Sequence, residues 1–148
     1  MTDWRRAGAD DAVALADLER DANLVGLAHV FPPEQFPFPW DGVRERWSAT
    51  LDEPGVVVEV VDGSEGLEAF LAHDGTTLRH LAVHPDRWGQ GLARTAVERA
   101  AAAGAHRLWC LVDNHRARAL YEHLGFRETG GSRQAPWPPY PTELELAR

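Results

Sequence analysis

A strand, a bend and a glycine-rich turn that opens into a helix follow one another in residues 78–93, and this order limits what the chain can fold into. The segment reads Leu-Arg-His-Leu-Ala-Val-His-Pro-Asp-Arg-Trp-Gly-Gln-Gly-Leu-Ala, with Pro85 at the bend and Gly89 and Gly91 in the turn. Small residues let a backbone approach a ligand closely, and the free N–H groups of a helix's first turn favour phosphate. The segment therefore predicts a site for a phosphate-bearing ligand.

The bulk properties indicate a single domain over residues 1–148, large enough to bury a hydrophobic core. The formal net charge of -8 argues against nucleic acid or an anionic membrane as a partner. No apolar run approaches the roughly 20 residues that span a bilayer, and the first residues lack the apolar core of a signal peptide. We expect a soluble, cytoplasmic protein.

The one cysteine of the chain, Cys110, excludes an internal disulfide and fits a reducing compartment. It stands in the apolar run Leu108–Val112, which is typical of a buried strand. A packed structural thiol is the simpler interpretation, and a reactive nucleophile is the alternative.

Hydrophobic periodicity and turn residues divide the chain into alternating elements. Three strands joined by tight turns precede the glycine-rich turn, and a helix, a strand and a second helix follow it, which indicates an α+β or α/β domain on a mixed sheet. Four prolines between Val30 and Trp40 rule out a regular helix or central strand there. We expect helices at 10–23, 42–51, 90–103 and 114–124, and strands at 56–61, 67–73, 76–83, 107–112, 126–128 and 144–146.

A second motif lies downstream, where Asn114-x-x-Ala117-x-x-Leu120-Tyr121 is followed by Gly125-Phe126. With the first segment, it resembles the GNAT superfamily of N-acetyltransferases over essentially the whole chain. The family signature Gln/Arg-x-x-Gly-x-Gly/Ala reads Trp88-Gly89-Gln90-Gly91-Leu92-Ala93 here, so the two small positions match and the first position departs. The resemblance implies a mixed, mostly antiparallel sheet of six to seven strands, flanked by about four helices, with two strands splayed apart.

The resemblance also implies acetyl-CoA as co-substrate, with its pantetheine arm between the splayed strands. The arm would pair with backbone groups of Leu81 and Val83, as an added strand does. The pyrophosphate would lie on the amides of Gly89 to Arg94, and the Asn114 amide would hold the arm as well as cap its helix. The implied cofactor-binding residues are Leu81, Val83, Trp88, Gly89, Gln90, Gly91, Leu92, Ala93, Arg94 and Asn114.

Tyr121 lies seven residues after Asn114, two helical turns on, so both fall on one helix face. By resemblance, its phenol would stabilise or protonate the departing thiolate while an amine attacks the thioester directly. Proton transfer from a phenol to a thiolate is uphill by about 2 kcal/mol, which favours a charge-assisted hydrogen bond with late transfer. The alternative is a tyrosine that only packs in the core.

The sequence leaves several candidates for the general base that would deprotonate the amine. Strand alternation places Thr77, Arg79 and Leu81 on one face, without a base near pH 7, and His80 on the other. Glu68, His73 and Glu34, or a chain of water molecules, are the other candidates. The seven histidines show no zinc-site spacing, so we expect no metal.

Two loops rich in proline and aromatic residues, 31–40 and 135–141, flank these motifs. By resemblance they would wall the acceptor site, where stiff aromatic side chains would form a flat-sided pocket. The substrate-contacting candidates are Glu34, Trp40, Trp137 and Tyr140. The alternative is that the loops close the end of the sheet or form a homodimer contact.

The favoured interpretation is acetyl transfer from acetyl-CoA to a primary amine of a small molecule. Acetylation of a peptide or protein amine is one alternative. A binding module that senses acyl-CoA without catalysis is another, and the absence of an obvious base counts slightly for it. A third is an interaction protein that assembles through its exposed loops.

Overall fold

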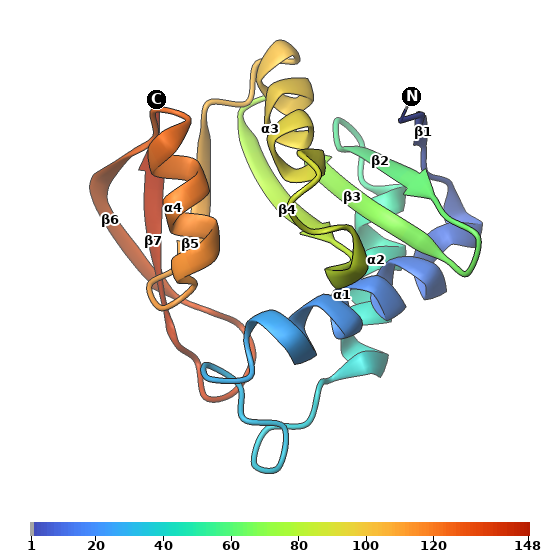
Figure 1. The fold of residues 1–148 in the computed structure, drawn as a ribbon, viewed down its shortest axis with the longest axis horizontal. Helices are drawn as coiled ribbons and strands as arrows, with labels where there is room; N and C mark the ends of the chain where they lie inside the picture. The colour runs from blue at the N-terminus through green and yellow to red at the C-terminus, as the bar shows by residue number, and fades with distance from the viewer. Residues whose placement is uncertain (1) are drawn as a thin grey trace.

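A computed structural model describes residues 2–148 as one seven-stranded sheet with helices on both faces (Figure 1). These residues form four α-helices and two short 3-10 turns, η1 and η2. In chain order the elements are β1 (Trp4–Arg6), η1 (Ala9–Asp11), α1 (Ala12–Gly26), α2 (Trp40–Asp52), β2 (Val57–Asp62), β3 (Leu67–His73), β4 (Thr77–Val83), η2 (Pro85–Arg87), α3 (Leu92–Ala102), β5 (Arg107–Leu111), α4 (His115–His123), β6 (Arg127–Gln134) and β7 (Thr142–Ala147).

The strand order is β1-β2-β3-β4-β5-β7-β6, and only β4 and β5 run parallel to each other. The expected mixed, mostly antiparallel sheet is therefore confirmed. The parallel pair is joined through α3, because parallel neighbours need a crossover connection.

The two faces of the sheet bury separate cores. α1 and α2 cover one face, where the fully buried Trp47 packs edge-on against Phe70 at 4.9 Å between ring centroids. α3 and α4 cover the other face, where Val97 and Tyr121 share a core with Leu108 of β5. Because helices lie on both faces, β3 in the middle of the sheet is buried along most of its length.

β4 and β5 pair over two positions only, Thr77 with Arg107 and Leu78 with Leu108. Beyond Leu78 the two strands separate, which confirms the expected splay. α1 crosses below the open end of this wedge, and the loops at 27–39 and 135–141 lie beyond it (Figure 1). The fold therefore brings α1 and two loops that are far apart in the sequence to the open end of the wedge.

A β-bulge in β4 corrects the expected strand alternation. His80 pairs with Ala72, but Leu78 pairs with His73, so Arg79 is an extra residue without a partner on β3. The extra residue breaks the period of two, and Leu78 and Leu81 both join the core under α3. The expectation that Arg79 and Leu81 share a face was therefore wrong, whereas His80 does lie on the opposite face from Leu81.

One strand and several element boundaries also differ from expectation, among them the ends of α1 (Ala12–Gly26) and β7 (Thr142–Ala147). The short strand β1 was missed because three residues with two arginines give no periodic signal. β6 extends to Gln134 instead of ending at 128, because its register shifts between Glu128 and Ser132 and pairing with β7 then resumes. α2 begins at Trp40, so this residue belongs to a helix and not to the preceding loop.

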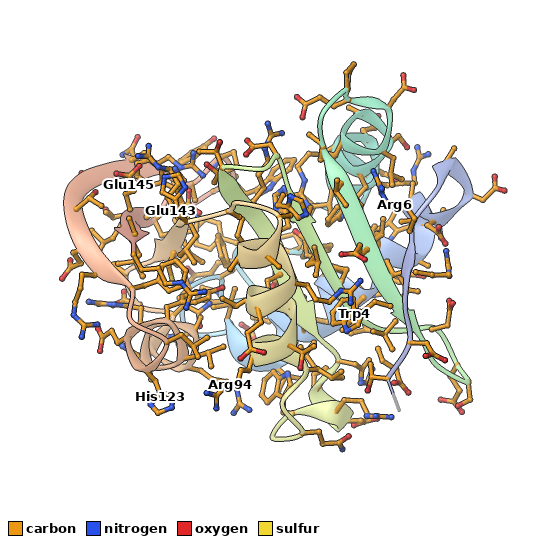
Figure 2. All side chains as sticks on the ribbon, turned by 90° about the horizontal axis from the view of Figure 1, so that it is seen from above. Trp4, Arg6, Arg94, His123, Glu143 and Glu145 are labelled. Carbon is orange, nitrogen blue, oxygen red and sulfur yellow. The ribbon has the colours of Figure 1, made fainter. Side chains whose placement is uncertain are left out.

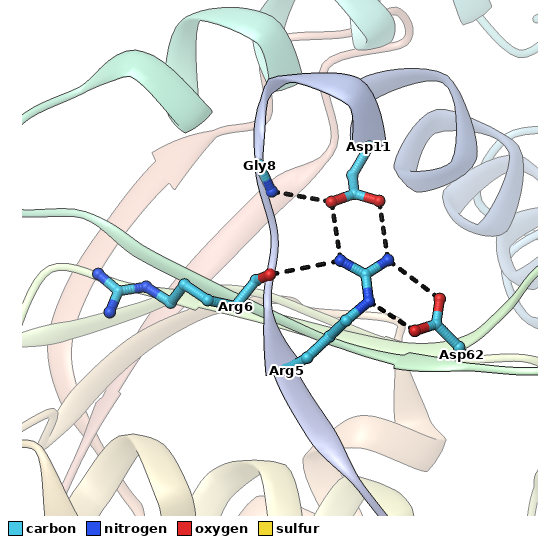
Figure 3. Close-up of polar contacts among 5 residues, drawn as sticks. All are labelled: Arg5, Arg6, Gly8, Asp11 and Asp62. Atoms are coloured by element: carbon cyan, nitrogen blue, oxygen red, sulfur yellow. Dashed lines mark hydrogen bonds and ion pairs between the residues drawn. The ribbon is translucent and has the colours of Figure 1, made fainter.

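Arg5 fastens β1 to its surroundings (Figure 3). Its guanidinium donates two hydrogen bonds to Asp11 in η1, at 2.9 and 3.0 Å, and two to Asp62 at the end of β2, at 2.5 and 3.0 Å. Asp11 also accepts the N–H of Gly8 at 2.8 Å. These contacts raise the pKa of Arg5 and lower the pKa values of both carboxyls.

Candidate functional site

Two cavities meet along the wedge between β4 and β5. The first, here called the cofactor cavity, has a volume of about 410 Å³ and lies between the glycine-rich turn, α4 and the end of α1. The second, the wedge cavity, has about 200 Å³ and opens on the α1 side of the sheet. Both are lined by Asn23, Leu81, Ala82, Asn114, Ala117 and Tyr121, so a molecule that enters one reaches the other.

The backbone of β4 presents unpaired N–H groups to this wedge. His84 donates its N–H to Glu68 O of β3 at 2.8 Å, and alternate residues of a strand point their backbone groups the same way. The N–H groups of Leu81 and Val83 therefore point away from β3, toward the cofactor cavity that both residues line. The carbonyl of Val83 accepts the indole N–H of Trp88 at 2.8 Å.

The glycine-rich turn is open because of its backbone conformation. Gly89 and Gly91 have φ values of 81° and 82°, in the left-handed region that favours glycine. Gly91 caps α3 without a side-chain acceptor, and its carbonyl already accepts the N–H of Thr95. Within residues 2–148, the six consecutive amides of residues 89–94 donate no hydrogen bond to the protein. Such a row of amides at a helix N-terminus binds anions.

Positive side chains surround this row of amides. Arg87, Arg94 and Arg116 all line the cofactor cavity, and Arg94 lies beside the start of α3 on the side toward α4 (Figure 2). Arg116 stacks over the ring of Trp88 at 4.2 Å from its centroid. Sequence reasoning missed Arg116, because the residue comes close to the glycine-rich turn only in the folded structure. Its position in the sequence does not indicate this. Gln90, in contrast, does not line the cavity.

Trp88 fills the signature position that departs from the family pattern. Its indole spans from Val83 to the end of α1, where a Cβ on Gly26 would lie 3.5 Å from the ring. The side chain therefore lines the cofactor cavity and joins three elements around it. Leu92 and Ala93 of α3 complete this wall.

Asn114 begins α4 as the sequence predicts. Its side-chain oxygen accepts the N–H of Ala117 at 3.3 Å, which satisfies one first-turn donor. The residue also lines both wedge cavities. The cap therefore directs α4 so that its next turns face the wedge.

Tyr121 lies where both wedge cavities meet, two turns along α4. Only 8% of the residue is exposed, and its ring packs edge-on against Phe126 at 5.8 Å between centroids. Burial raises the pKa of Tyr121 above its ordinary value, with a smaller contribution from Cys110. The phenol makes no hydrogen bond within residues 2–148, so a protonated donor faces the wedge without a protein acceptor.

Of the four candidate bases, the structure brings only His80 to the wedge cavity. Glu68 accepts a hydrogen bond from Arg87 at 2.9 Å and does not line it. His73 is buried under α3, where its Nδ1 accepts the N–H of Gly75 at 3.2 Å. Glu34 is exposed on the 27–39 loop.

His80 stays uncharged at neutral pH. Burial, with repulsion from Arg46, Arg79 and Arg133, lowers the pKa of His80 to about 3. Its ring packs against Trp47 at 5.0 Å between centroids. A neutral imidazole accepts and donates hydrogen bonds, but at this pKa it holds a proton only weakly.

A third cavity lies beyond the wedge cavity, enclosed by both proline-aromatic loops. This aromatic cavity has a volume of about 290 Å³. Its lining consists of Glu19, Asn23, Leu24, Phe31, Pro33, Gln35, Phe36, Pro37, Phe38, Pro39, Trp137 and Pro138. Glu19 and Asn23 also line the wedge cavity, so the two cavities adjoin.

Of the four acceptor-site candidates, only Trp137 lines the aromatic cavity. Trp40 donates its indole N–H to Asp17 of α1 at 2.9 Å and fastens α2 to α1. Tyr140 is half-exposed and lies outside the cavity. Glu34, on the other loop, is also exposed and does not line the cavity. The loops do wall a cavity beside the wedge, but these three side chains are not part of it.

Two residues of α1 that sequence reasoning missed connect the cavities. Glu19 accepts hydrogen bonds from Arg46 at 2.5 Å and from Trp47 Nε1 at 3.0 Å. Asn23 lines all three cavities, and its side chain makes no hydrogen bond within residues 2–148. Their spacing of one helical turn places them on one face, but nothing in the helix pattern marks that face as functional.

Residues 2–148 hold no group of three or more His, Cys, Asp or Glu side chains placed to bind a metal ion. None of the helices in the same range combines the length and apolar character needed to cross a membrane.

Known proteins resemble this chain in sequence and in fold. Residues 2–126 match the model of the acetyltransferase (GNAT) family. A mycothiol acetyltransferase of Beutenbergia cavernae is 33% identical over 81% of this chain, which spans 50% of that relative's length. The apo-form YjaB of Escherichia coli has a TM-score of 0.77 at 19% identity, covering 99% of this chain and 97% of that chain.

A coenzyme A complex is also among the structures with this fold. PaiA N-acetyltransferase of Thermoplasma acidophilum, solved in complex with coenzyme A, has a TM-score of 0.67 at 12% identity and covers 100% of this chain and 99% of that chain. The family match covers most of the described residues and includes both motifs. This chain belongs to the GNAT family of acetyltransferases.

Proposed function

We propose that this protein transfers the acetyl group of acetyl-CoA to a primary amine of a small molecule in one step. The row of open amides at residues 89–94, which leads directly to the wedge at Tyr121, carries this proposal. Family membership supports acetyl transfer, and the geometry supports acetyl-CoA as the donor.

The residues present fit coenzyme A along its length. The amides of 89–94, with Arg94 and Arg116, complement the charge of a pyrophosphate. The free N–H groups of Leu81 and Val83 suit the amide carbonyls of a pantetheine arm, which would extend the sheet at β4. The arm would then end beside Tyr121.

The chemistry needs few protein groups, because a bound thioester supplies an already activated acyl carbon. The amine nitrogen forms a bond to that carbon, the carbon–sulfur bond breaks, and the amine loses one proton while the sulfur gains one. The N–H of Leu81 would stabilise the negative charge that develops on the carbonyl oxygen. Tyr121 would donate a hydrogen bond to the departing sulfur. Because burial raises the pKa of the phenol, the phenol keeps its proton and the thiolate takes one from solvent.

The amine's proton leaves through the wedge cavity. His80 is neutral there and relays the proton to solvent without storing it, since its pKa is about 3. This arrangement supports a chain of water molecules with His80 as one member.

Cys110 supports direct attack in place of an acyl-enzyme route. The thiol lines the wedge cavity, but burial raises its pKa to about 12, so the reactive thiolate is absent at neutral pH. Its free, buried thiol also supports a reducing, cytoplasmic setting.

Turnover separates this proposal from an acyl-CoA sensor. The purified protein is incubated with acetyl-CoA and a panel of primary amines, and release of the coenzyme A thiol and the mass of the N-acetyl product are followed. We expect amine-dependent release, retained in Cys110→Ala and strongly reduced in Tyr121→Phe. Binding of acetyl-CoA without turnover of any amine would instead support the sensor, and turnover of peptides alone would support a protein acceptor.

A further inference from the structure

The aromatic cavity is built for an uncharged, apolar body. Phe31, Phe36, Phe38 and Trp137 line it together with prolines, and Glu19 is its only charged lining residue. An apolar cavity of about 150 Å³ holds a benzene ring, so the 290 Å³ here leaves room for one or two fused rings. No cationic side chain lines it to pair with an acidic acceptor.

The cavity wall is held in place before any ligand arrives. The ring of Trp137 lies against the start of α2, where a Cβ on Gly42 would come within 2.6 Å of it. Trp137 Nε1 is buried and unpartnered within residues 2–148. A cavity lined by aromatic rings and prolines suits an aromatic ligand, because ring faces stack on one another and prolines hold little conformational freedom.

The end of the aromatic cavity that meets the wedge is polar. Asn23 presents there a side-chain amide that has no hydrogen-bond partner within residues 2–148. Glu19 adds a carboxylate that its contacts with Arg46 and Trp47 hold in position. An amine at this point lies beside the wedge cavity, which Tyr121 also lines. An amide oxygen and a carboxylate both accept hydrogen bonds from an amine.

We infer that the acceptor is a primary amine joined by a short linker to a flat, uncharged aromatic body. The ring occupies the aromatic cavity, and the amine is held by Asn23 and Glu19 within reach of the thioester in the wedge. This inference rests on the proposed acetyl transfer and adds its substrate class. Asn23 acts in it as a specificity-determining residue.

The test compares amines with and without a ring in the whole protein. Tryptamine and 2-phenylethylamine are the ring-bearing probes, ethylamine is the ring-free match, and spermidine is the polycationic alternative. We expect kcat/KM for the ring-bearing amines to exceed that of the other two by at least about tenfold. Equal or higher kcat/KM for ethylamine or spermidine would overturn the inference.

Two neighbouring residues of α1 provide a matched pair of variants. Leu24 is 46% exposed and lines the aromatic cavity, whereas Val25 is 60% exposed and lines none of the three cavities. Leu24→Arg should raise KM for tryptamine about tenfold with little change in kcat, whereas Val25→Arg should leave both unchanged. A similar KM for tryptamine in both variants would overturn the placement of the ring.

Calorimetric measurement of acetyl-CoA binding to the same samples distinguishes a wrong substrate class from a wrong proposal of acetyl transfer. If acetyl-CoA binds and only ring-free amines are acetylated, the substrate class is wrong and the acetyl transfer stands. If acetyl-CoA does not bind, both fail together. Leu24→Arg should bind acetyl-CoA as the unsubstituted protein does, because Leu24 does not line the cofactor cavity.

Discussion

Tyr121 combines three properties that suit a hydrogen-bond donor to a leaving sulfur. It lies at the meeting point of two cavities, its phenol has no acceptor within residues 2–148, and burial keeps it protonated. The sequence predicted its helix face from the spacing to Asn114. Its burial and its position in the wedge depend on the separation of β4 and β5, which no local pattern encodes.

Removing the phenol oxygen should slow the reaction without weakening cofactor binding. For Tyr121→Phe we expect kcat to fall by up to about 100-fold, because a hydrogen bond to a charged group contributes roughly 1.5–3 kcal/mol. The ring should still pack against Phe126, so the fold and the cofactor cavity are retained. Steady-state kinetics measure kcat, and calorimetry should give an unchanged Kd for coenzyme A. A kcat within twofold of the unsubstituted protein would show that the residue only packs.

His80 should make the folded state sensitive to acid. Its pKa in the fold is about 3 against an ordinary 6.5, so the unfolded chain binds the extra proton first as pH falls. The contribution of the neutral ring to the free energy of unfolding is fully present above pH 6.5 and is lost as the pH falls toward 3. The loss can reach at most about 5 kcal/mol.

The variant His80→Gln should reduce this slope. We expect urea unfolding between pH 7 and pH 4 to show a smaller loss of free energy in the variant than in the unsubstituted protein. The buried His73 has a lowered pKa too and acts in the same direction, so part of the slope should remain. Identical slopes in the two proteins would contradict a partly buried His80 that stays neutral.

In the proposed function the glycine-rich turn binds coenzyme A through its backbone amides. Alanine substitutions at two glycines test this role. Gly91 and Gly55 both have φ values of 82°, and a Cβ would meet no heavy atom within 4 Å at either position. Alanine at either should cost about 1 kcal/mol or more of stability through backbone strain. Only Gly91→Ala should also weaken coenzyme A binding, measured by calorimetry, whereas Gly55 lies outside the cofactor cavity. Equal affinities in both variants would remove the turn from the binding site.

The contacts of Arg5 that hold edge strand β1 against η1 and β2 can be tested by substitution. Arg5→Met removes both carboxylate contacts, and because Arg5 is 43% exposed we expect a loss of only about 1 kcal/mol at pH 7, after allowing for solvent screening. Asp11 and Asp62 have pKa values below the ordinary 3.8, so this contribution is present above that pH and is lost as pH falls through their folded values. The thermal stabilities of the two proteins should therefore differ at pH 7, and the difference should shrink as the pH falls below 3.8.

At the level of elements, the sequence predicted what local chemistry determines. Asn114 as a helix cap and the turn at Gly89 and Gly91 depend on neighbours in the chain, and both are present as expected. The bulge at Arg79 and the length of β6 depend on pairing with other strands, which periodicity does not encode. The aromatic loops were assigned to the acceptor side, but which side chains face inward is decided by packing such as that of Trp137 on Gly42.

At the level of the whole molecule, the cofactor cavity and the wedge cavity open toward different faces of the sheet. The cofactor cavity lies on the side of α3 and α4, and the wedge cavity opens on the side of α1. Beside the latter, Glu143 projects from the sheet face opposite α4 (Figure 2). In the proposed reaction, a donor in the cofactor cavity and an acceptor in the wedge cavity would meet at Tyr121, which lines both, and direct transfer would need no acyl-enzyme.

The proposed reaction requires that the wedge bind acetyl-CoA, and calorimetric titration of the purified protein measures this binding. Acetyl-CoA, free coenzyme A and ATP are titrated separately into the purified protein. We predict one-to-one binding of acetyl-CoA and coenzyme A and none of ATP, because the wedge recognises the pantetheine arm in addition to phosphate. Absence of acetyl-CoA binding at sub-millimolar ligand would contradict the account and leave the glycine-rich turn a purely structural feature.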